Sequence, residues 1–113
     1  MEEGGNSVKI RDFRGIEVVL YPRLFDHIRH RHPDMLRILN ISDKHGLNAI
    51  IRDILENPHE VYRDYEGVYY YIKRLNKIFV TVIVYENIVR TMYLLSNKSY
   101  NRMRSKRWVC RVY

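Results

Sequence analysis

Residues 24–33 read LFDHIRHRHP and hold three of the five histidines in this 113-residue chain. Two of these three, His27 and His32, are close in the sequence to Arg29 and Arg31. An imidazole exchanges a proton near neutral pH, and a guanidinium binds a phosphate through two parallel hydrogen bonds. RNA cleavage without a metal needs a base for the 2′-hydroxyl, an acid for the leaving 5′-oxygen, and cations for the developing charge. The segment fits that chemistry; the alternative is a basic, partly exposed helix end.

The same histidines do not make a recognisable metal site. His27 and His30 are three residues apart and would allow one shared ion, but zinc takes three or four ligands. No cysteine or carboxylate is placed to complete such a set. His27 and His32 are about 140° apart around a continuous helix, so they would not share a face. The sequence therefore predicts no metal and no other cofactor.

Two strand-like segments carry further candidates. In residues 88–95, alternation puts Thr91 and Tyr93 on one face, where they would offer two hydroxyls to a phosphate or base, and Arg90 on the other. Residues 68–74, VYYYIKR, put Lys73 on one face and Tyr70 on the other. Aromatic rings interleaved with cations suit unstacked bases and their phosphates. The alternative for both segments is ordinary strand composition, since Thr and Tyr favour strands.

Positive charge gathers at the C-terminus. The chain has a net charge of +7, and residues 98–113 hold most of it because they contain no acid. Such a segment binds polyanions by releasing their counterions. The alternative is a solvated basic end, or one that docks onto an acidic protein. The candidate RNA-binding residues, here and elsewhere in the chain, are Arg23, Tyr70, Lys98, Arg102, Arg104, Lys106, Arg107 and Trp108.

The elements that must position these residues follow from apolar spacing. An apolar stripe at helical spacing predicts a helix through residues 47–55, with Ser42 or Asp43 as its cap and Asn57-Pro58 after it. Pro22 suits the first turn of an earlier helix, which Pro33 ends or bends. Strands are predicted at 15–21, 60–64, 68–75, 78–86 and 88–95.

This order predicts an α+β fold in which two N-terminal helices pack on one face of an antiparallel sheet of about four to five strands. The length fits a single domain, 1–113, with a core at 15–95, a flexible start at 1–7 and a basic C-terminal extension at 98–113. No apolar run approaches the ~18–20 residues of a membrane span. A single cysteine and an acidic, Gly-rich start favour a cytoplasmic protein.

The order of motifs resembles the phage-associated nuclease domains of the barnase, EndoU, colicin and RelE-like superfamily, over roughly residues 15–95. The resemblance implies a curved sheet and a metal-independent endoribonuclease, often a toxin or effector. The matching pieces are Arg23, His27-Ile28, Arg31-His32-Pro33, the Ile50/Ile54 stripe, Asn57-Pro58 with Val61, Tyr70 with Lys73, and Thr91 with Tyr93.

Carried onto this chain, the resemblance implies that His27 or His32 is the general acid or base and that Arg31 clamps the phosphate. Lys73 would be a second cation, and Thr91 with Tyr93 would orient the phosphate or base. The segment beyond residue 95 is not part of the family pattern. It would bind RNA, or it would be gripped by a neutralising partner such as an acidic antitoxin or immunity protein.

The leading hypothesis is therefore an enzyme that cleaves RNA and leaves a 2′,3′-cyclic phosphate. A second hypothesis is a non-catalytic nucleic-acid-binding module of viral or regulatory type, which uses the same tyrosines and basic segment without histidine chemistry. A third is a protein-interaction domain whose basic end binds an acidic partner.

Overall fold

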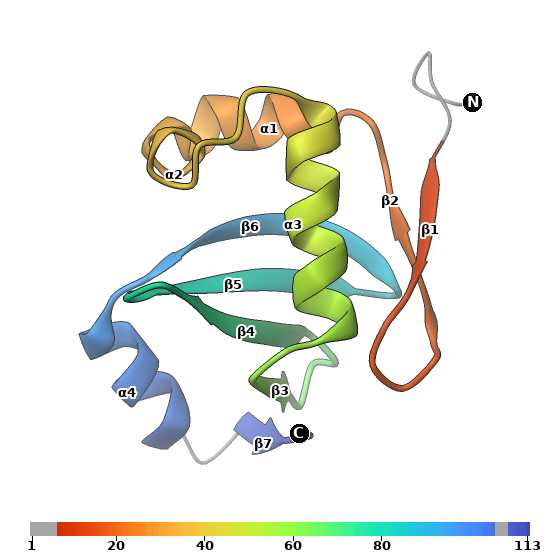
Figure 1. Cartoon of the computed structure of the whole chain (residues 1–113). Helices are drawn as coiled ribbons and strands as arrows, with labels where there is room; N and C mark the ends of the chain where they lie inside the picture. The colour runs from red at the N-terminus through yellow and green to blue at the C-terminus, as the bar shows by residue number, and fades with distance from the viewer. Residues whose placement is uncertain (1–6, 106–108) are drawn as a thin grey trace.

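Helices and strands are interleaved along the chain (Figure 1). The computed structural model describes residues 7–105 and 109–113, and over those residues it contains four helices and one seven-stranded sheet. In chain order the elements are β1 (Val8–Arg11), β2 (Glu17–Leu20), α1 (Leu24–Arg31), α2 (Pro33–Ile38), α3 (Lys44–Glu56), β3 (Glu60–Asp64), β4 (Tyr69–Leu75), β5 (Ile78–Tyr85), β6 (Ile88–Leu95), α4 (Asn97–Ser105) and β7 (Val109–Arg111). Within those two ranges, no helix is both long and apolar enough to cross a bilayer.

The strand order in the sheet is β1-β2-β6-β5-β4-β3-β7, and β3 to β6 form an antiparallel meander. Between β5 and β6, Glu86 and Asn87 both have positive φ, 54° and 62°, as the type I′ turn of a two-residue hairpin requires. β2 joins β6 in parallel through the single pair Val19 and Ile88. Helix α1 packs against β6 next to this junction.

This architecture corrects the expectation of two N-terminal helices on one face of an antiparallel sheet of about four to five strands. In the described residues the sheet is mixed and has seven strands, with helices between them. β1 and β7 are only four and three residues long, too short for alternation to reveal them. Helix α4 buries only Met103 within Asn97–Ser105, so it offers no apolar stripe to predict it from.

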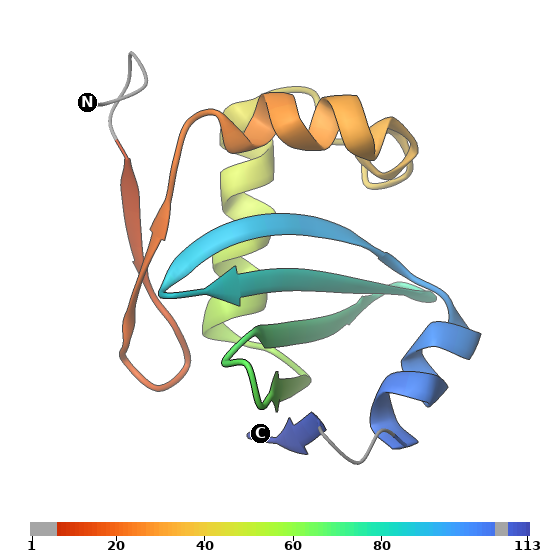
Figure 2. The same ribbon diagram turned by 180° about the vertical axis from the view of Figure 1, so that it is seen from behind.

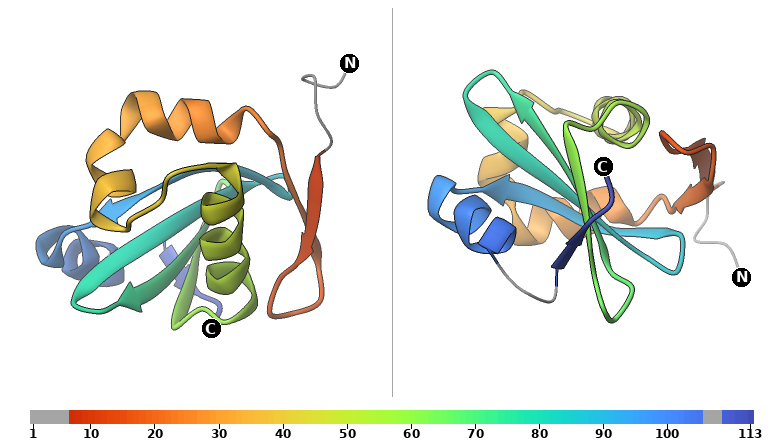
Figure 3. Two further views of the ribbon diagram at one scale, coloured as in Figure 1. Left: turned by 45° about the horizontal axis from the view of Figure 1, so that its top comes forward. Right: turned by 90° about the horizontal axis from the view of Figure 1, so that it is seen from below.

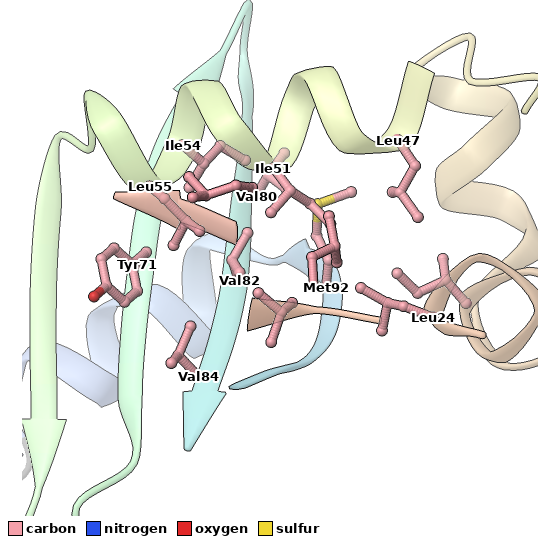
Figure 4. Packing of buried hydrophobic residues seen from close by; sticks show 14 of the residues in the cluster. Leu24, Leu47, Ile51, Ile54, Leu55, Tyr71, Val80, Val82, Val84 and Met92 are labelled. Carbon is pink, nitrogen blue, oxygen red and sulfur yellow. The ribbon is translucent and has the colours of Figure 1, made fainter. Parts of the chain in front are cut away.

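Helix α3 covers one face of the sheet and forms the main core with it (Figure 4). Its stripe of Leu47, Ile51 and Ile54 is buried, which confirms the predicted helix. Asp43 caps the first turn: its Oδ1 accepts a hydrogen bond from the backbone N–H of Gly46 at 2.9 Å. Such a cap contributes about 1 kcal/mol.

Pro33 divides the N-terminal helical region into α1 and α2. It is the first residue of α2, where its missing N–H costs no hydrogen bond. His32 stands between the helices as the C-cap of α1 and the N-cap of α2, with φ −136°. Leu24 and Ile28 anchor α1 in the main core. The predicted break at Pro33 is confirmed, and it fixes the position of His32.

The opposite face of the sheet is covered in part by α4 (Figure 2). Figure 3, in the view from below, shows α3 on one side of the strands and α4 on the other. Met103 packs in a second apolar cluster with Tyr62, Ile72 and Leu95. Tyr100 stacks on Phe79 with ring centroids 4.2 Å apart. Residues of the expected basic extension thus belong to the folded body, and β7 extends the sheet beside β3.

A buried acid ties the β1–β2 loop to β4. Asp12 is 5% exposed, and its Oδ2 accepts hydrogen bonds from the Tyr71 hydroxyl at 2.6 Å and the Arg14 guanidinium at 2.8 Å. Burial raises the pKa of Asp12, but the bonds from Tyr71, Arg14 and two backbone N–H groups outweigh it and leave the pKa below its ordinary value. This network belongs to the scaffold, because none of its members lines the groove described next.

Candidate active site

A groove of about 420 Å³ lies between α1 and β6 on the face of the sheet opposite α3. Five side chains line it: His27, Arg31, His32, Thr91 and Tyr93. These are five of the six residues to which the sequence assigns a catalytic role, and they come from segments about sixty residues apart. The structure therefore brings the imidazoles, a guanidinium and the hydroxyl-bearing strand to one place.

Helix α1 presents its groove residues through its own geometry. Leu24 and Ile28 are buried, whereas His27 and Arg31 are exposed and lie four residues apart. Residues at this spacing are neighbours on a helix surface. The apolar pair anchors α1, and the polar pair consequently borders the groove.

His32 reaches the groove from the break between α1 and α2. Its ring lies 5.7 Å from that of Tyr93, centroid to centroid, with 38° between the planes. Burial lowers the pKa of His32 below its ordinary 6.5, and the nearby His27 and Arg31 lower it further. The neutral imidazole, which accepts a proton, is therefore favoured at neutral pH. Burial also raises the pKa of the Tyr93 phenol, so this hydroxyl keeps its proton.

Thr91 lines the groove without exposing its hydroxyl. Its Oγ1 is buried and has no hydrogen-bond partner among the described residues. An unpaired buried hydroxyl costs about 1–3 kcal/mol. Thr91 therefore shapes the groove wall and does not offer its oxygen to a ligand in this conformation.

A β-bulge in β6 turns Arg90 away from the core face of the sheet. Strict alternation predicts it on the opposite face from Thr91. In the β5–β6 register Ile83 pairs with Thr91 and Val84 pairs with Val89, so Arg90 is the extra residue. Val89 and Met92 both belong to the main core. Two successive residues, Arg90 and Thr91, consequently lie off the core side, and strict alternation is broken. The sequence signal for this bulge is the spacing of Val89 and Met92, two apolar residues of one strand that are three positions apart instead of two.

Lys73 is not part of the groove. β4 directs it to the α3 face, where its Nζ forms an ion pair with Asp53 Oδ2 at 2.9 Å. The assignment of Lys73 as a second catalytic cation therefore does not fit the geometry. The alternation of β4 separates it from Tyr70, which lies on the groove side of the sheet in register with Ile83.

Tyr70 shares the second apolar cluster with Tyr93. Its hydroxyl donates to Asp64 Oδ2 at 3.0 Å. Burial and this bond raise the pKa of Tyr70 to about 12. The phenol is therefore neutral and fixed in place, as a stacking surface requires.

The remaining RNA-binding candidates occupy different places. Arg23 lines a pocket next to the groove, and Lys98, Arg102 and Arg104 are exposed on α4. Arg104 also lies over the Tyr100 ring at 5.5 Å. Lys106, Arg107 and Trp108 lie outside the described residues. Within the described part of the chain, no group of three or more His, Cys, Asp or Glu could hold a metal ion.

Comparison with known proteins adds no assignment. No family model matches the chain, and no curated protein or solved structure matches it either.

Proposed function

We propose that this protein is a metal-independent endoribonuclease and that the groove between α1 and β6 is its active site. The observation that carries the proposal is the convergence of His27, Arg31, His32 and Tyr93 on one groove of about 420 Å³. The resemblance of the HIxxRHP and T-x-Y motifs to the barnase, EndoU, colicin and RelE-like nucleases supports the same reaction class. A cytoplasmic location, where RNA is abundant, belongs to the proposal.

His32 is the proposed general base. Its lowered pKa favours the neutral ring, which removes the proton from the 2′-hydroxyl. The 2′-oxygen attacks phosphorus and the bond to the 5′-oxygen breaks, leaving a 2′,3′-cyclic phosphate. His27, which lines the same groove, protonates the departing 5′-oxygen.

Arg31 is the proposed phosphate ligand. It is exposed on α1 and lines the groove together with both histidines. A guanidinium binds two phosphate oxygens at once and stabilises negative charge as it develops. Tyr93, held neutral by burial, offers its ring to a base.

Helix α4 supplies a basic border on the same side of the sheet (Figure 2). Lys98, Arg102 and Arg104 are exposed on this helix. Cations of this kind bind the RNA backbone without regard to sequence. The same helix is the proposed contact for an acidic antitoxin or immunity protein, since a negative partner would neutralise it.

The experiment that tests this proposal is incubation of the folded protein with total RNA in excess chelator. We expect fragments whose new 3′ ends carry a 2′,3′-cyclic phosphate, identified by mass spectrometry. RNA that remains intact at equimolar enzyme would reject the proposal. Fragments with other end groups would reject the mechanism.

The second candidate function is a non-catalytic nucleic-acid-binding module. Tyr70 and Tyr93 on one sheet face, bordered by a basic helix, would bind a single strand without any proton transfer. This module would bind RNA in the experiment above and leave it uncut.

A further inference from the structure

A second pocket, of about 220 Å³, adjoins the groove at the start of β6. His27 lines both cavities. Tyr21, Arg23 and Arg90 also line this pocket. One histidine thus stands between two cavities that both contain arginine.

We propose that this pocket is a second phosphate subsite, which binds the phosphate next to the scissile one in a single strand of RNA, with Arg90 as its principal ligand. The inference rests on the proposed function, because His27 defines the cleavage position. A polynucleotide carries a phosphate at every nucleotide, so neighbouring anions need neighbouring cationic sites. Cavities that share one side chain are suitably placed for adjacent nucleotides.

The bulge in β6 gives Arg90 this role. In regular alternation Arg90 would lie with Met92 towards the α3 core; the register shift between Ile83 and Val84 turns it away. Bulges occur next to active sites, where they redirect a side chain. An arginine pointing into the core would leave a buried charge, so the bulge and the arginine are mutually consistent.

The Arg90 guanidinium is held in position but keeps donors for a ligand. Its Nε donates to the backbone carbonyl of Tyr85 at 3.2 Å, and its Nη2 donates to Glu86 Oε1 at 3.4 Å. It also lies over the Tyr85 ring, 5.6 Å from the centroid. A guanidinium has five N–H donors, and Nη1 makes no hydrogen bond to the described residues. These contacts orient the group and leave Nη1 for a phosphate oxygen.

Arg23 adds a second positive charge and Tyr21 an aromatic surface to the same pocket. The Arg23 guanidinium lies over the Tyr21 ring at 5.6 Å from the centroid. A base can stack on a tyrosine while its phosphate meets the arginines. Glu86 forms an ion pair with Arg90 at 3.4 Å, and it competes with a phosphate for that side chain.

The test compares Arg90→Gln with Arg52→Gln. Arg52 is a matched control, because it lies on α3 and pairs with Glu56 at 3.5 Å over the same four-residue spacing, away from both cavities. The substrates are an RNA dinucleotide, with one phosphate, and trinucleotides extended at the 5′ or the 3′ side. We expect one extension to raise kcat/KM about tenfold, the value of one charge-assisted contact. Arg90→Gln should lose that gain and cleave the dinucleotide normally, and Arg52→Gln should keep it.

A binding measurement separates this inference from the proposed function. The probe is an RNA with 2′-deoxyribose at the cleavage position, which binds but is not cut. Arg90→Gln should reduce the slope of log K against log salt by about 0.7, the value for one phosphate contact on a single strand. If wild type cuts no RNA but this slope still falls, the nuclease proposal fails and Arg90 stands as a phosphate ligand without a neighbouring cleavage site.

The variant Glu86→Gln is a second test that does not depend on whether Arg90→Gln folds normally, because it leaves Arg90 in place. It should tighten binding of the same probe by removing the competing carboxylate. Three results would overturn the inference. Arg90→Gln keeps the gain in kcat/KM from both extensions, or it slows cleavage of the dinucleotide as much as cleavage of the trinucleotides. The third is weaker binding of the 2′-deoxy probe by Glu86→Gln.

Discussion

The imidazole ring of His32 lies against the phenol ring of Tyr93, with 5.7 Å between their centroids. The two residues are about sixty positions apart, and Pro33 and the strand β6 bring them together. His32 is partly buried in this packing, and burial together with the nearby His27 and Arg31 lowers its pKa. The packing that positions the proposed base therefore also keeps it neutral.

The lowered pKa of His32 predicts a pH-dependent stability. The unfolded chain takes up a proton near 6.5, whereas folded His32 takes it up at lower pH. Between these values the unfolded state binds more protons, so the free energy of unfolding rises with pH. We expect wild type to lose stability below about pH 6.5 more steeply than His32→Asn, measured by urea unfolding from pH 5 to 8. Parallel pH profiles would contradict a lowered pKa.

Thr91→Val tests the buried hydroxyl. The variant removes an unpaired polar atom and keeps the side-chain shape, so unfolding should cost about 1 kcal/mol more than in wild type. Cleavage should change less than the roughly tenfold loss that a missing substrate hydrogen bond would cause. Loss of cleavage in a stable variant would show that this hydroxyl meets the substrate.

Neutralising α4 tests its role as an RNA contact. The double variant Lys98→Gln/Arg102→Gln removes two exposed charges. We expect weaker binding to single-stranded RNA and a salt slope reduced by about 1.4, or 0.7 for each phosphate contact. The melting temperature should not change, since Met103 and Tyr100 anchor the helix. An unchanged salt slope would assign α4 to another partner.

Asp12→Ala tests the scaffold apart from the chemistry. The substitution leaves the Tyr71 hydroxyl and the Arg14 guanidinium without their shared acceptor. We expect a loss of about 3 kcal/mol in urea unfolding, the lower end for a broken buried pair, because Arg14 is partly exposed. At urea concentrations below its unfolding midpoint, the Asp12→Ala variant should still cut RNA. A loss of less than about 1 kcal/mol would mean that solvent already screens the pair.

Residue type and local spacing were enough to predict the separate pieces that line the groove. The four-residue spacing of His27 and Arg31, the break at Pro33 and the alternation of Thr91 with Tyr93 are all local properties, and each appears in the structure. Their meeting depends on α1 packing against β6. No single segment specifies that meeting, because it depends on contacts between residues far apart in the sequence.

Lys73 and Arg90 do not lie where the sequence predicted them, and each departure has a physical cause. Lys73 belongs to the other sheet face because a strand alternates, and Asp53 on α3 pairs with it there. Arg90 changes face through one extra residue in β6, which alternation cannot foresee. Helix α4 is stabilised because Met103 and Tyr100 pack on a sheet face whose residues are far away in the sequence. Its polar sequence therefore predicts its charge but not the helix.

In the proposed mechanism His27 takes part in bond cleavage and not merely in RNA binding. The most direct measurement compares wild type with His27→Ala, on one RNA for cleavage and on its 2′-deoxy analogue for affinity. We expect cleavage by His27→Ala to fall at least about 10²-fold, as for a lost general acid or base, with affinity largely unchanged. Cleavage that persists, or cleavage and affinity that fall together, would contradict it.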